Sequence, residues 1–158
     1  MNYLLRLCVI LFFILIVQPS AIAQKLKEKE VPQTILESFK KDYPNIYVYK
    51  WKRNKKTGVI QAKYYDKGIK YKTYYDHNYN WLRTEREVKK EDVPQDVWIN
   101  MAQSEYYSWN IDDLKELQTQ KHDLIYEIEI KKKGKSSKRK VYLYYLPDGS
   151  LVNTKAKK

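Results

Sequence analysis

The sequence contains little cysteine, histidine, glycine or proline. Its 158 residues include one Cys, two His, four Gly and five Pro. So few Cys and His argue against a zinc ribbon, a disulfide scaffold or a Cys/His nucleophilic site. His77 and His122 lie in turn and loop segments without a nucleophile beside them, and there is no Gly-rich phosphate loop. We therefore expect a protein without cofactor, metal or enzymatic activity.

Aromatic and basic residues are abundant instead. There are 16 Tyr and four Trp, and 43% of all residues are hydrophobic, which excludes wholesale disorder. Aromatic side chains fit pleated, half-buried strands, so the composition indicates much β-structure. The length suits one domain or two very small ones. The net charge of +12 keeps the chain soluble and attracts polyanions without specifying a partner.

The first 23 residues have the pattern of a secretory signal peptide. A short start carrying Arg6 precedes an apolar run over residues 7–17, and the small-residue triplet Ala21-Ile22-Ala23 follows. The apolar run is much shorter than the roughly 20 residues that span a bilayer. We expect cleavage after Ala23 and a periplasmic or secreted protein that does not span the membrane. Cys8 lies in this leader, so the remaining chain contains no cysteine.

A short motif occurs twice along the chain. Val31-Pro32-Gln33 returns as Val93-Pro94-Gln95, and helically spaced apolar residues follow each copy. Alternating segments after each helix predict strands at 46–51, 59–66 and 69–76, and at 111–118, 124–131 and 140–146.

The sequence therefore predicts an α+β fold of two tandem helix-plus-antiparallel-sheet repeats. The repeats would cover 31–87 and 88–154, with both helices on one face of the sheet. The two sheets would either join into one or pair across a pseudo-twofold axis. Residues 24–30 would form a polar linker and residues 155–158 a basic tail.

Several of these motifs together carry a family resemblance. They are Val31-Pro32, Phe39-Lys40-Lys41-Asp42-Tyr43-Pro44-Asn45, Trp51, Trp81-Leu82-Arg83-Thr84-Glu85, Val93-Pro94 and Asp148-Gly149. In this order and after an exported leader, they resemble PepSY-like and beta-lactamase-inhibitor-like periplasmic proteins. The sequence departs from that pattern at Tyr79, where a turn glycine is usual, and at Glu105-Tyr106-Tyr107, which replaces a Tyr-Pro. The resemblance implies a helix-and-antiparallel-sheet architecture and a non-enzymatic binding or inhibitory role, without an established target.

Strand alternation separates two faces of the predicted sheet. Ile60, Ala62 and Tyr64 would point under the helices. The opposite face would present tyrosines and lysines, of which we select Tyr65, Tyr74, Tyr142 and Tyr144, with Lys63, Lys72 and Lys140 around them, as binding residues. They would capture an envelope protein such as a hydrolase, because Tyr gives a large contact area at little entropic cost. The same residues would equally stabilise a solvated sheet through cross-strand pairs.

A basic segment connects two of the predicted strands. Its candidate residues are Lys131, Lys132, Lys133, Lys135, Lys138 and Arg139. This hairpin would bind an anionic glycan or lipid, or would be a solvated loop that blocks edge-to-edge pairing. A second run over residues 50–56 mixes basic residues with Trp51. We expect Trp51 to pack on the sheet edge and expect no nucleic acid partner, since an exported protein rarely meets one.

Overall fold

The computed structural model describes residues 23–132 and 140–157. The predicted signal peptide falls on residues 1–22 apart from its last position, Ala23, and so lies outside the described residues. Most of the predicted basic hairpin, residues 133–139, lies outside them as well.

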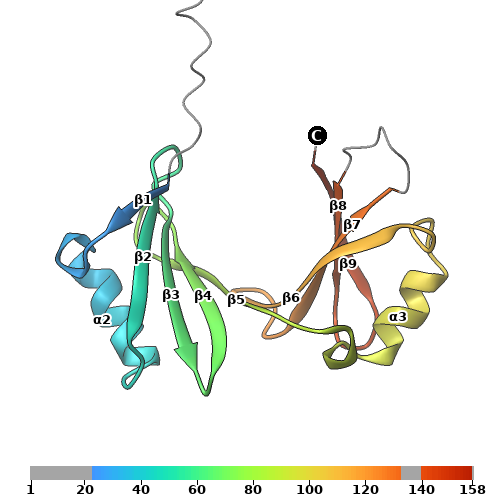
Figure 1. Cartoon of the computed structure of the whole chain (residues 1–158), viewed down its shortest axis with the longest axis horizontal. Coiled ribbons are helices and arrows are strands. Elements are labelled where there is room, and N and C mark those ends of the chain that lie inside the picture. The colour runs from blue at the N-terminus through green and yellow to red at the C-terminus, as the bar shows by residue number, and fades with distance from the viewer. Residues whose placement is uncertain (1–22, 133–139, 158) are drawn as a thin grey trace, which may run out of the picture.

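One antiparallel sheet dominates the described chain (Figure 1). Its nine strands lie in sequence order, each paired with the next. They are β1 (Ala23–Leu26), β2 (Val48–Asn54), β3 (Ile60–Asp66), β4 (Ile69–Tyr75), β5 (Trp81–Glu87), β6 (Asn110–Thr119), β7 (Ile125–Lys131), β8 (Lys140–Tyr145) and β9 (Leu151–Lys157). The helical elements are the short 3₁₀ turns η1 (Glu28–Glu30) and η2 (Lys90–Asp92) and the helices α2 (Gln33–Asp42) and α3 (Gln95–Ala102).

The predicted division into two helix-plus-sheet repeats is wrong. Strand β5 pairs with β6 over five residue pairs, from Arg83–Thr119 to Glu87–Lys115, so hydrogen bonding runs through the middle of the chain. The two helices of the described part contain only 10 and 8 residues. An unpaired strand edge is costly, and pairing β5 with β6 removes two such edges. The fold is therefore a single β-rich sheet with two short helices on it.

Local sequence explains where the helices begin. In η1 the backbone N–H of Lys27 donates to the Glu30 carboxylate at 2.6 Å, and in η2 Lys89 donates to Asp92 at 3.0 Å. Pro32 and Pro94 then occupy the N-cap positions of α2 and α3. Proline suits the start of a helix because its missing N–H would have no helical partner there.

Both helices pack on the same face of the sheet. Directly paired residues share a face, and Tyr126, which is buried with the α3 core, pairs with Glu116. Glu116 pairs in turn with Arg86, which lies on the same face of β5 as Thr84. Thr84 contacts Tyr43 just after α2, so this one face carries both helices.

Two separate cores lie under the helices. The α2 core is rich in aromatic residues: Leu26, Val31, Ile35, Phe39, Trp51, Ile60, Ala62, Tyr64 and Tyr75. The α3 core is mostly aliphatic: Val93, Val97, Met101, Leu114, Tyr126, Ile128, Ile130, Val141, Leu143 and Tyr145. Trp51 is only 4% exposed and meets the Phe39 ring edge-on at 5.8 Å, so the expectation that it packs on the sheet edge is wrong. On the helix-covered face, the paired residues of β5 and β6 between the two cores are polar. Arg86 donates there to both Glu116 oxygens at 2.9 and 2.6 Å.

Two turns at the ends of the hairpins have the same hydrogen bonds. In the β4–β5 turn Asp76 N–H donates to Asn80 O and Tyr79 N–H to Asp76 O, and in the β8–β9 turn the same bonds join Leu146, Gly149 and Ser150. The fourth residue of each five-residue turn has a positive φ, +71° at Tyr79 and +81° at Gly149. Tyr79 thus adopts the conformation that normally favours glycine.

The segments expected at the two ends of the folded region take part in the sheet. Residues 24–30, expected as a polar linker, include most of β1 and all of η1. Residues 155–157 of the expected basic tail belong to β9.

Candidate functional site

The face of the sheet opposite the helices is the candidate site, and we call it the open face. In Figure 1, α2 and α3 lie on the outer sides of the two halves of the sheet, and the open face looks inward between these halves. No helix of the described chain covers it. The sequence assigned the faces correctly in β3, since Ile60, Ala62 and Tyr64 are at most 1% exposed while Tyr65 is 55% exposed.

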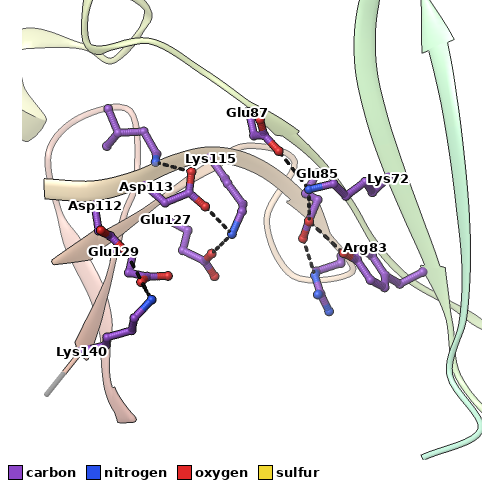
Figure 2. A network of polar contacts seen from close by, with 12 residues as sticks. Lys72, Arg83, Glu85, Glu87, Asp112, Asp113, Lys115, Glu127, Glu129 and Lys140 are labelled. Carbon is purple, nitrogen blue, oxygen red and sulfur yellow. Dashed lines mark hydrogen bonds and ion pairs between the residues drawn. The ribbon is translucent and has the colours of Figure 1, made fainter. Parts of the chain in front are cut away.

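Ion pairs organise the middle of the open face (Figure 2). Glu85 on β5 is only 6% exposed, yet each of its oxygens has partners. Its carboxylate lies 3.5 Å from Lys72 Nζ and accepts from Arg83 Nε at 3.3 Å and from the Tyr74 hydroxyl at 2.8 Å. A buried charge needs such partners, because removing it from water is otherwise very costly.

A second group of ion pairs follows on β6 and β7. Lys115 Nζ lies 3.0 Å from Asp113 and 3.1 Å from Glu127. Burial lowers the pKa of Lys115, but the two carboxylates outweigh burial and raise the pKa above the ordinary lysine value. Lys115 therefore stays charged and holds two strands together.

The third group joins β6, β7 and β8. Asp112 lies 2.5 Å from Lys131 Nζ and 3.3 Å from Lys140 Nζ, and Lys140 also bonds Glu129. The hydrogen bond from Lys131 is the largest of the causes that lower the pKa of Asp112 to about 2. Together the three groups neutralise charge on the open face from β4 to β8.

The four predicted tyrosines lie on the open face in different environments. Tyr65 is exposed, whereas Tyr74 is packed under the Arg83 guanidinium, whose carbon lies 3.9 Å from the ring centre. Burial, followed by Glu85, raises the pKa of Tyr74. Tyr142 and Tyr144 are partly buried, and burial together with Glu129 and Glu127 respectively raises the pKa of each. Three of these tyrosines thus also contact the ion pairs of the sheet.

The predicted lysines also differ from one another. Lys72 and Lys140 have carboxylate partners, while among the described residues no ion pair reaches Lys63. Of the basic hairpin, Lys131 pairs with Asp112 and Lys132 is exposed. The remaining hairpin residues, Lys133, Lys135, Lys138 and Arg139, lie outside the described residues.

Sequence reasoning missed Tyr49 on the open face. The β2–β3 register shifts between Val48 and Lys50, so the chain contains a bulge there. A bulge re-aims a side chain, and Tyr49 stacks on Tyr65 with ring centres 5.3 Å apart. Simple alternation would have placed Tyr49 on the face opposite Lys50, and no local signal marks the bulge.

A shallow hollow of about 520 Å³ lies at one end of the open face, beside Tyr144. Its lining includes Leu82, Ile125, Val152 and His122. Within the described residues no group of His, Cys, Asp and Glu is arranged to hold a metal ion. Of the helices in the described part of the chain, none is both long and apolar enough to cross a lipid bilayer.

Solved structures resemble this architecture although sequence comparison finds little. The sequence matches no known protein family and no curated protein. A DUF2874 family protein from Bacteroides uniformis superposes with a TM-score of 0.64 at 20% identity, covering 80% of this chain and 89% of that one. A BLIP-like protein from Bacteroides fragilis superposes with a TM-score of 0.62 at 28% identity, covering 79% and 85%. The fold is BLIP-like.

A third structure with this BLIP-like fold is a predicted periplasmic protein from Bacteroides eggerthii. Its TM-score is 0.62 at 19% identity, and the match covers 80% of this chain and 88% of that one. The beta-lactamase-inhibitor-like part of the resemblance seen in the sequence therefore agrees with the structural neighbours. The PepSY-like part stays a prediction.

Proposed function

We propose that the protein is a non-enzymatic, periplasmic binding or inhibitor-like protein that captures a protein partner on its open face. The observation that carries this proposal is a broad face of a nine-stranded sheet that no helix of the described chain covers. Tyr74, Tyr142 and Tyr144 on this face are held in place by neighbouring charges, which reduces the entropy lost on binding. The neighbours described as BLIP-like and periplasmic support the same role and compartment.

Capture from an envelope extract tests this proposal. The chain from residue 24 onward is immobilised, and retained proteins are identified by mass spectrometry, with hydrolases as the first class to look for. The retained partner is then purified and titrated against Tyr65→Ala/Tyr142→Ala, which removes two tyrosines from the open face. We expect at least tenfold weaker binding, because interfacial Tyr residues carry a large share of binding energy.

A matched control removes two tyrosines elsewhere. Tyr47 and Tyr107, 77% and 73% exposed, lie in the segments that follow α2 and α3. Tyr47→Ala/Tyr107→Ala should bind the partner as the unchanged chain does. Equal loss in both double variants, or no specific capture at all, would refute partner binding on the open face.

The basic hairpin gives a weaker alternative, in which the protein binds an anionic glycan or lipid. Lys131, where the hairpin begins, and Lys140, directly after it, are already paired with Asp112, which reduces their attraction for an external anion. Salt-sensitive retention on heparin that disappears when the hairpin lysines are neutralised would favour this alternative.

A further inference from the structure

Lysines face one another across the first half of the open face. Lys50 on β2 lies directly opposite Lys63 on β3, and Lys63 lies opposite Lys72 on β4. Lys52 pairs with Lys25 of β1 in the same way. Like charges directly opposite in a sheet are destabilising, so packing alone gives no reason for this arrangement.

The described chain supplies few counter-charges to these lysines. Ion pairs reach Lys72, through Glu85 and Glu87, but among the described residues none reaches Lys50, Lys52, Lys63 or Lys70. We call these last four residues the lysine cluster. Burial and then repulsion by Lys52, Lys72, Lys70 and Lys50 lower the pKa of Lys63, which indicates an uncompensated positive field.

An aromatic surface adjoins the lysine cluster. The bulge at Val48–Lys50 turns Tyr49 onto the open face, where it stacks on Tyr65. Tyr49 and Tyr65 are 38% and 55% exposed, and Tyr65 lies opposite Lys70. Bulges are common where a functional side chain must be re-aimed, and exposed stacked tyrosines are typical of protein interfaces.

Building on the proposed function, we propose that the lysine cluster and the Tyr49–Tyr65 stack dock a carboxylate-rich segment of the protein partner that also carries an aromatic or apolar side chain. Charge complementarity selects the carboxylates, and the stack accepts the apolar group. Beyond Lys72 the open face carries carboxylates of its own, of which Glu87 is exposed while Glu85 and Glu127 are mostly buried in ion pairs. A long, uniformly charged polyanion would gain nothing there, whereas a folded partner can place its own basic or neutral residues over these carboxylates.

A short peptide tests the chemistry of this site. The probe is a capped hexaglutamate peptide with one tryptophan, titrated at low salt and followed by amide and side-chain NMR shifts. We expect the largest shifts at Lys63 and Tyr65, and affinity that falls as salt rises because exposed charges are screened. The triple variant Lys50→Gln/Lys63→Gln/Lys70→Gln should bind at least tenfold more weakly without losing stability, since it removes repulsion.

The control variant carries the same change of net charge on the helix side. Lys29→Gln/Lys40→Gln/Lys41→Gln neutralises exposed lysines of η1 and α2 and should bind the peptide normally. Equal weakening in both triple variants would show attraction by bulk charge only and would overturn the inference. Binding of heparin tetrasaccharide or phosphatidylglycerol vesicles at the cluster, without binding of the peptide, would also overturn it.

Binding of the captured partner to both variants distinguishes failure of this inference from failure of the proposed function. A partner that binds the lysine-cluster variant as tightly as the unchanged chain, yet loses binding to Tyr65→Ala/Tyr142→Ala, would refute the lysine site and leave partner capture intact. Failure to capture any envelope protein would refute the proposed function itself.

Discussion

The two halves of the open face are built from similar residue types and differ in their charge pairing. In the first half Lys50, Lys63 and Lys72 face one another across three strands. In the second half Lys115 faces Glu127. Lys131 and Lys140 do lie opposite each other there, but Asp112 pairs with both of them. The second half is therefore stabilised by its own charges, while the first retains positive charge that a partner can use. Tyrosine and lysine content alone therefore does not locate a binding surface, because cross-strand partners decide which charges remain available.

Removal of an aromatic ring from the α2 core should reduce stability most. Phe39→Ala should lower the free energy of unfolding by about 3–5 kcal/mol, because a buried aromatic ring leaves a cavity. Phe39 contacts Tyr43, Trp51 and Tyr64 through ring pairs. Urea denaturation measures the decrease in the free energy of unfolding, and amide hydrogen exchange shows which strands open more readily. Since β5 and β6 join the halves, we expect faster exchange in β7 and β8 as well as in β2 to β4. Faster exchange in β2 to β4 alone would mean that the halves unfold separately.

The next largest effect on stability is expected in the two similar turns, between β4 and β5 and between β8 and β9. A Cβ on Gly149 would lie 2.6 Å from the Asp96 carbonyl oxygen at a φ of +81°, so Gly149→Ala should cost about 2–4 kcal/mol. Tyr79→Gly relieves the same backbone conformation in the first half and should change stability by about 1 kcal/mol or less.

Gly68→Ala is a useful control for the turn experiment. Its φ is +80°, but a Cβ there meets nothing within 4 Å. Thermal melts of the three variants should therefore rank Gly149→Ala as the most damaging. Equal losses for Gly149→Ala and Gly68→Ala would show that backbone strain alone is responsible and that contact with α3 adds nothing.

The ion pairs of the open face give a smaller effect. Glu85→Ala should cost about 1–3 kcal/mol, because it leaves the Tyr74 hydroxyl and Arg83 without their acceptor. Glu87, whose side chain is 61% exposed, also pairs with Lys72, and Glu87→Ala should cost about 1 kcal/mol or less. Chemical denaturation of both variants distinguishes them, and indistinguishable midpoints would contradict the structural role of Glu85.

The smallest effect is a dependence of stability on pH, which arises from Asp112 in the second half of the open face. The pKa of Asp112 is depressed to about 2, so its contribution to stability is complete above the ordinary aspartate pKa of about 3.9 and is lost as the pH falls towards 2. A carboxyl NMR titration should place its midpoint near pH 2. In Lys131→Gln/Lys140→Gln the midpoint should rise towards 3.9, and an unchanged midpoint would show that the two lysines are not the cause.

Local patterns predicted much of the secondary structure. Proline after valine marked the start of each helix, and alternation placed Ile60, Ala62 and Tyr64 on the buried side of β3. Alternation could not reveal the bulge that brings Tyr49 beside Tyr65, because a bulge has no reliable local signature. Nor could it show that Tyr74 is held between Glu85 and Arg83, residues that lie on the neighbouring strand.

Local sequence was enough to predict the abundance of strands, the start of each helix and the buried side of β3. These depend on backbone preferences and on the period of side chains along one segment. Strand pairing in three dimensions was needed to show that all the described strands form one sheet and that Glu85 pairs with Lys72, while no carboxylate of the described residues pairs with Lys63. Pairing between strands fixes these neighbours, and the energy of a charge depends on what lies opposite it across the sheet.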